Sequence, residues 1–154
     1  MKKFLMTLFV ILAAISAHAS ASYAQGAAKT GPDPSTLRDE ELEKDSLHNL
    51  EVARHYFKLK KAYVAAIKRC EEIDAGNPNF AKMDEVLFIA GESSLRLSEN
   101  RGKQQTKEKT AERLRQDARV YLSRLVSDYP NSVFAKQVEA DLQALGGPIP
   151  KPTP

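Results

Sequence analysis

Apolar residues recur every three or four positions between residues 36 and 145 of this 154-residue chain. That spacing is typical of helices that bury one face. No stretch of strand length alternates apolar and polar residues, and neither Asn-Gly nor Asp-Gly, the strongest hairpin signals, occurs there. The pattern therefore predicts an all-α fold.

Five helices fit this pattern, and their ends are marked by capping and breaking residues. We expect them, in order, at about residues 36–60, 62–75, 79–98, 104–127 and 132–145. Acidic residues from Asp39 suit the positive end of the first helix dipole. Gly76 is expected to end the second helix in a left-handed conformation, followed by Asn77 and Pro78.

The N-terminus carries the three parts of a removable export signal. Lys2 and Lys3 precede an apolar run from Phe4 to Ala17, and small residues follow, with Ala24 as the preferred last residue of the signal. About 20 apolar residues are needed to cross a bilayer, and this run is shorter. We therefore expect residues 1–24 to be a signal peptide of an exported, periplasmic protein that keeps no integral membrane segment.

The remaining chain divides into three parts by composition. Residues 25–36 are rich in Gly, Ala and Pro and predict a flexible linker, residues 37–145 predict one helical domain, and residues 146–154 form a Pro-rich tail. We expect the linker and the tail to be mobile.

A short motif occurs twice and indicates an internal repeat. Residues 78–82 read Pro-Asn-Phe-Ala-Lys and are followed by Glu85; Pro-Asn recurs at 130–131 and Phe-Ala-Lys at 134–136, followed by Glu139. The repetition predicts that one helix-turn-helix unit is used twice.

The first unit resembles the tetratricopeptide repeat, a helical hairpin of 34 residues. Its large and small positions are matched by Leu50, Phe57, Tyr63, Ala66 and Cys70, and Pro78 ends it, whereas Arg54 stands where a small residue is usual. The resemblance implies two hairpins and a C-terminal capping helix in a right-handed superhelical stack. An unrelated helical bundle is the alternative fold.

The amino-acid sequence of the repeats is also similar to that of BamD-like outer-membrane assembly lipoproteins, over about residues 46–145. This resemblance implies a scaffold that binds another envelope protein or a peptide segment, in outer-membrane or cell-envelope assembly, and that can lie at the periphery of the outer membrane. The chain departs from the family in having only two hairpins and no lipid-accepting Cys after the signal. Self-association stays open.

The family geometry also implies a concave groove that would hold a peptide. The residues that it assigns to the groove are His48, Glu51, His55, Lys58, Glu85, Phe88, Glu92, Leu95 and Arg96.

Charged residues are distributed unevenly along the chain. Their numbers nearly balance: without Lys2 and Lys3, which would leave with the signal, 21 basic residues face 20 acidic ones. Such a balance gives no reason to expect a nucleic-acid partner. A basic patch for an acidic partner or an anionic membrane is a candidate alongside the plain interpretation of a solvated helix. Its residues are Arg101, Lys103, Lys107, Lys109 and Arg113.

Catalytic motifs are missing from the sequence: it has no Gly-rich phosphate loop, no Gly-x-Ser-x-Gly and no His-Glu-x-x-His. We therefore expect no enzyme, cofactor or resident metal. The alternative is a small metal-binding or hydrolytic enzyme that uses the His48 and His55 pair or Cys70. Cys70 is the chain's one cysteine, and its spacing from Ala66 and Ile73 favours a place in the core over a reactive thiol.

Overall fold

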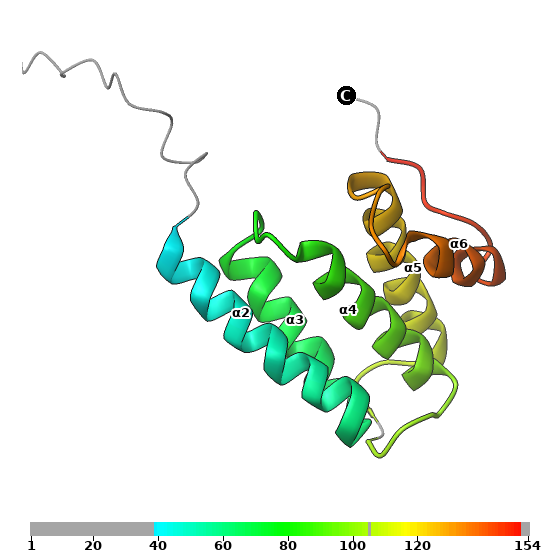
Figure 1. Ribbon diagram of the computed structural model, residues 1–154. Coiled ribbons are helices and arrows are strands. Elements are labelled where there is room, and N and C mark those ends of the chain that lie inside the picture. Colours follow the sequence, from blue (N-terminus) through cyan, green and yellow to red (C-terminus); the bar gives the residue numbers. More distant parts are fainter. Residues whose placement is uncertain (1–38, 105, 152–154) are drawn as a thin grey trace, which may run out of the picture. The chain divides into compact units, whose positions relative to one another are not determined.

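The computed structural model describes residues 39–104 and 106–151, and these form helices joined by loops, with no strand (Figure 1). The prediction of an all-α fold is confirmed. The predicted signal peptide and linker lie outside the described residues. The helices are α2 (Glu40–Arg54), η2 (His55–Lys60), α3 (Tyr63–Gly76), α4 (Met83–Ser98), α5 (Ala111–Asp128) and α6 (Ala135–Ala144).

The first predicted helix is present but changes type near its end. The Asp39 carboxylate accepts hydrogen bonds from the backbone N–H groups of Glu41 and Leu42, at 2.9 and 3.2 Å, and so caps α2. The last six residues form the π-helix η2, which is wider than an α-helix. Lys61, with a φ of 51°, ends it in the left-handed region.

The predicted left-handed conformation of Gly76 is wrong. Gly76 is the last residue of α3, and its φ is not positive, unlike those of three other glycines in the described chain. Asn77 makes the end instead: its backbone N–H donates to the Ile73 carbonyl at 2.8 Å, and its buried side chain donates to Ser46 Oγ of α2 at 3.2 Å. Pro78, which lacks an N–H group, then prevents another turn.

Helices α4 and α5 begin later than predicted, by about four and seven residues. Residues 99–104 and 106–110 lie in a loop, whereas the fourth helix was predicted to start near residue 104. The N-cap of α5 is Thr110, whose hydroxyl accepts from the Arg113 backbone N–H at 3.2 Å. The loop is held across the domain because the Lys103 N–H donates to the Lys61 carbonyl at 3.0 Å.

Helices that follow one another along the chain pack side by side from α2 to α6. Their apolar faces form one core, whose fully buried side chains include Leu50, Ile73, Leu87, Leu122, Leu125 and Leu142. Burial of these faces is the main stabilising term. None of the described helices has the length and apolar character needed to span a membrane.

The tightest contact in this core lies between α4 and α5, at Gly91. A Cβ atom added to Gly91 would lie 2.4 Å from Cδ2 and 2.6 Å from Cγ of Leu122, which is fully buried. Only a residue without a side chain allows this approach of the two helices.

The described part of the C-terminal tail returns along α5, although we expected a free segment. Arg119 donates to the Gly147 carbonyl at 2.7 Å, and the Ile149 N–H donates to the buried Ser123 Oγ at 2.8 Å. Lys151 pairs with Asp128 at 3.0 Å. These contacts attach the tail to α5 from Gly147 to Lys151.

Candidate functional site

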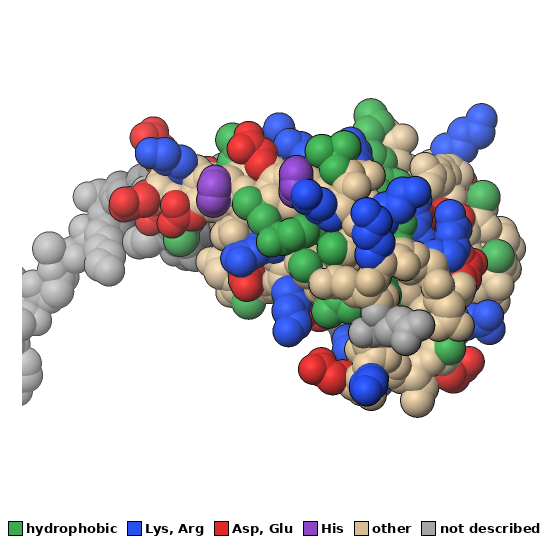
Figure 2. All heavy atoms as spheres, turned by 90° about the horizontal axis from the view of Figure 1, so that it is seen from below, with side chains coloured by type: hydrophobic (Ala, Val, Ile, Leu, Met, Phe, Trp, Pro, Cys, Tyr) green, Lys and Arg blue, Asp and Glu red, His purple; other side chains and the backbone are tan. Residues whose placement is uncertain are grey.

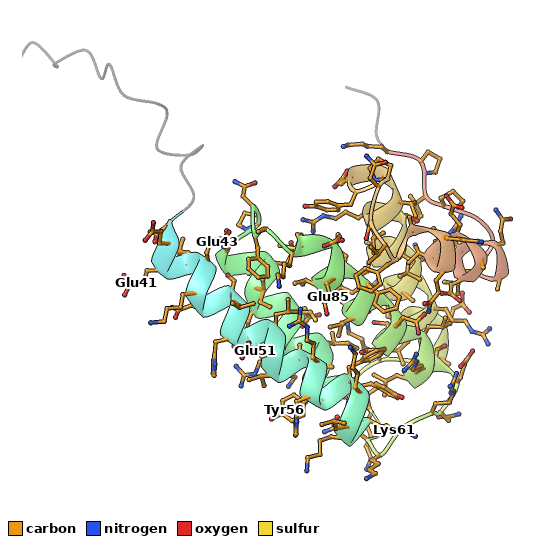
Figure 3. All side chains as sticks on the ribbon, viewed as in Figure 1. Glu41, Glu43, Glu51, Tyr56, Lys61 and Glu85 are labelled. Carbon is orange, nitrogen blue, oxygen red and sulfur yellow. The ribbon has the colours of Figure 1, made fainter. Side chains whose placement is uncertain are left out.

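The first four predicted groove residues follow one exposed side of α2 and η2. His48, Glu51, His55 and Lys58 are all solvent-exposed. The two purple histidine side chains are visible on the surface in Figure 2, and Glu51 is labelled on α2 in Figure 3. This part of the predicted groove is therefore open to a partner.

Glu85 on α4 is instead engaged with α2. Arg54 Nε donates to Glu85 Oε1 at 2.6 Å, and the second guanidinium nitrogen contacts the other carboxylate oxygen. This hydrogen-bonded pair lowers the pKa of Glu85 and raises the pKa of Arg54. Arg54, which departs from the repeat pattern, thus joins α2 to α4 at a position where the pattern has a small residue.

Phe88 is buried between helices and offers little surface to a ligand, since only 9% of it is exposed. Its ring stacks on Phe134, at the start of α6, with centroids 4.3 Å apart and planes inclined by 13°. It also meets the edge of Phe57 at 6.3 Å. The Phe of the repeated Phe-Ala-Lys motif therefore attaches α6 to α4.

Arg96 covers this aromatic cluster. Its guanidinium carbon lies 4.4 Å from the centroid of Phe57 and 5.6 Å from that of Tyr63, which is within the range of a cation–π contact. The same group pairs with Glu92 at 2.7 Å. Arg96 is half-buried, so it borders the groove but is not free within it.

Glu92 faces a second carboxyl group, Asp141 of α6. Burial, followed by a hydrogen bond to Asp141, raises the pKa of Glu92, whereas the charge of Arg96 opposes this. Asp141 Oδ2 is buried, and no N–H or hydroxyl donor among the described residues reaches it. Glu92 thus lies between the cation of Arg96 and a second carboxyl group, and its protonated form is favoured more than that of a solvent-exposed glutamate.

This pair gives a pH-dependent contribution to stability. Because the folded-state pKa of Glu92 is raised, its stabilising contribution is complete below about 4.3, the usual glutamate pKa, and is lost as the pH rises through the folded-state value. We expect Glu92→Gln, which stays neutral, to become more stable relative to the wild type as the pH rises over this range. Urea unfolding at a series of pH values measures the effect.

The matched control for this prediction is Glu139→Gln on the exposed side of α6. This substitution removes the same carboxyl group from an exposed side chain, so the two variants should differ in how their stability changes with pH. An equal pH dependence for Glu92→Gln and Glu139→Gln would contradict the raised folded-state pKa of Glu92.

A cavity of about 470 Å³ lies among α4, α5 and α6, next to this carboxyl pair. Its size is within the range of ligand pockets. Glu99, Glu112 and Arg115 are exposed at its edge, while Leu95 and Leu145 are half-buried. The lining residues are Leu95, Glu99, Glu112, Arg115, Gln116, Arg119, Asp141, Ala144 and Leu145.

Only Leu95 of the cavity belongs to the groove that the sequence predicted. The other lining residues come from the loop after α4, from α5 and from α6. No sequence motif connects these elements, because the contacts that bring them together are tertiary. The repeated Phe-Ala-Lys motif was the one sequence feature that pointed to Phe134, which stacks on Phe88 of α4.

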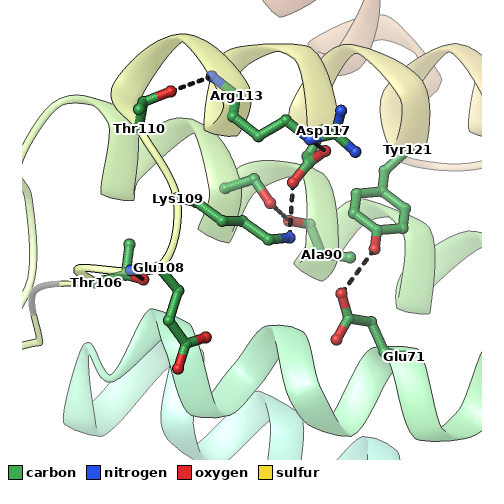
Figure 4. A network of polar contacts seen from close by, with 10 residues as sticks. Glu71, Ala90, Thr106, Glu108, Lys109, Thr110, Arg113, Asp117 and Tyr121 are labelled. Atoms are coloured by element: carbon green, nitrogen blue, oxygen red, sulfur yellow. Dashed lines mark hydrogen bonds and ion pairs between the residues drawn. The ribbon is translucent and has the colours of Figure 1, made fainter.

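The predicted basic patch is divided by ion pairs. Lys109 and Arg113 both bind Asp117, at 2.7 and 3.0 Å (Figure 4). Arg101 pairs with Glu99 at 3.1 Å. Lys103 and Lys107 stay exposed, with no salt bridge in the described part of the chain. The five residues therefore do not act as one free cationic surface.

The residues proposed for the alternative function, a metal-binding or hydrolytic enzyme, do not lie around a common centre. Cys70 is 1% exposed in the core, as its spacing predicted, and burial raises the pKa of its thiol. His48 and His55 lie on the outer surface of α2 and η2. Over residues 39–104 and 106–151, no group of three or more His, Cys, Asp or Glu side chains is placed to hold a metal ion.

Comparisons of the sequence with models of known protein families and with curated proteins, and of the structure with solved structures, found no match.

Proposed function

We propose that this chain is an exported helical-repeat scaffold that binds a segment of another cell-envelope protein, in outer-membrane or cell-envelope protein assembly. Its helices would form two tetratricopeptide-like hairpins, α2–α3 and α4–α5, with α6 as the cap. The binding surface would extend from the exposed side of α2 to the cavity among α4, α5 and α6.

The cavity is the observation that carries this proposal. It combines a half-buried apolar part at Leu95 and Leu145 with charges of both signs at its edge, Glu112 and Arg115, neither of which forms a salt bridge with another described residue. A peptide can place an apolar side chain in such a site and orient its backbone or charged groups at the edge. The helices from α2 to α6 pack in the order of the sequence, as a stack of hairpins would.

Site-specific photo-crosslinking in the native host tests the proposed surface. A photoreactive amino acid would replace Glu112 at the edge of the cavity, and in separate strains Glu51 on α2 or Lys136 on the outer side of α6. Each of these residues is exposed, so that folding should be preserved. We expect the same crosslinked protein from Glu112 and Glu51, and none from Lys136.

A second variant tests whether the crosslink depends on the cavity. Reversing both edge charges, Glu112→Lys with Arg115→Glu, keeps the net charge and should abolish the crosslink from Glu51. The control is Glu139→Lys with Lys136→Glu on α6, which should preserve it. Equal crosslinking from all three positions, or from none of them, would contradict this assignment.

A further inference from the structure

One end of the domain carries a group of unpaired lysines around an exposed leucine. We call this group the basic tip, and it consists of Lys58, Leu59, Lys60, Lys61 and Lys103. The first four are consecutive at the end of η2, and the backbone bond from the Lys103 N–H to the Lys61 carbonyl, 3.0 Å long, brings the loop beside them. All five side chains are solvent-exposed.

Acidic residues are missing from both segments of the tip. No Asp or Glu occurs between His55 and Cys70, nor between Asn100 and Lys107. None of the four lysines forms a salt bridge within the described chain. Lys58 interacts electrostatically with Glu85, but the Glu85 carboxylate is already paired with Arg54. In Figure 2, which views the molecule from below, blue and green side chains gather beside the two histidines, and red ones cluster toward the other end of α2, with others at the lower and right edges.

Leu59 distinguishes the tip from an ordinary solvated charged surface. It is 70% exposed, although it is a large apolar side chain at the end of a helix. The π-helical turn and the left-handed Lys61 end the helix here and fix this arrangement of lysines on both sides of Leu59. An apolar side chain between cations matches the boundary between lipid headgroups and acyl chains.

We propose that the basic tip binds an anionic lipid surface, with the lysines at the headgroups and Leu59 entering the interface. Each lysine near such a surface adds to the attraction, and the attraction falls with salt. A bilayer satisfies both parts of the tip at once, because it offers negative charge over an area and an apolar layer beneath it. This places the protein at a membrane surface independently of its cavity.

Vesicle sedimentation with the exported protein tests the proposal. We expect binding to phosphatidylcholine vesicles that contain phosphatidylglycerol, no binding to phosphatidylcholine alone, and release by salt. Lys60→Glu, Lys61→Glu and Lys103→Glu together should weaken binding by more than about a hundredfold, since each lysine contributes about fivefold. Leu59→Ser should weaken binding severalfold.

The matched control is Lys44→Glu, Lys82→Glu and Lys136→Glu, which changes the net charge equally at exposed positions away from the tip. It should keep most of the binding. All variants share the same N-terminus, so that any contribution of that segment cancels, and thermal melting checks their folding. Equal binding by the tip and control variants overturns the proposal. Stronger binding to polyglutamate than to anionic vesicles also overturns it, and indicates an acidic protein partner.

Discussion

Replacing Gly91 with leucine is expected to destabilise the domain by about 3 kcal/mol, because the new side chain would enter space filled by Leu122. The smaller change to alanine has two opposing effects. It gains about 1 kcal/mol in helix propensity, and loses about 1–3 kcal/mol by overpacking, so that a net loss of about 1 kcal/mol is expected. Urea unfolding measures both variants.

Gly76→Ala is the matched control for the substitutions of Gly91. Gly76 is also helical, but a Cβ atom added there would meet nothing within 4 Å. Stability should be unchanged, or higher by up to about 1 kcal/mol. A stable Gly91→Leu variant would show that α4 and α5 do not approach as closely as described.

Replacing Phe88 with alanine should cost about 3–5 kcal/mol, because it leaves a cavity in a closed aromatic cluster. Phe88 is 9% exposed, and its stack on Phe134 joins α4 to α6. We expect α6 to be loosened most, since it has fewer other contacts than the central helices. Chemical unfolding gives the energy, and hydrogen exchange of residues in α6 locates the loss.

The control for Phe88 is Val133→Ala, one residue before Phe134. Val133 is 87% exposed, so its truncation should change stability by less than about 0.5 kcal/mol. If Phe88→Ala were equally harmless, Phe88 would have to be a surface residue, as in the groove that the sequence predicted.

Helix number and core residues could be predicted because they depend on local periodicity. Leu50, Ile73 and Leu122 follow the three- and four-residue spacing, and each is buried. Cys70 was placed in the core by the same rule. Helix starts were less accurate. Apolar residues, Phe80 and Ala81, continue before Met83, although turns delay the start of α4, and the polar residues 104–110 gave no apolar periodicity from which to place the start of α5 at the Thr110 cap.

The candidate site was predicted only in part, because its partners lie in other helices. The family geometry assigned Glu85 and Glu92 to an open groove, but Arg54 binds the first and Asp141 contacts the second. The ion pair between α2 and α4 and the contact of two carboxyl groups between α4 and α6 have no local sequence signal. Burial of Phe88 likewise depends on Phe134, 46 positions later in the printed sequence.

The tail along α5 determines how this row of helices ends. A stack of helices leaves its last face open, and a second copy of the chain could continue the stack there. Here the Ile149 N–H donates a hydrogen bond to the buried Ser123 hydroxyl, and Lys151 forms a salt bridge with Asp128. The described tail thus covers part of α5 with a segment whose prolines lack the N–H group that pairing with another chain would need. Deletion of the tail would remove these contacts and expose the part of α5 that they cover.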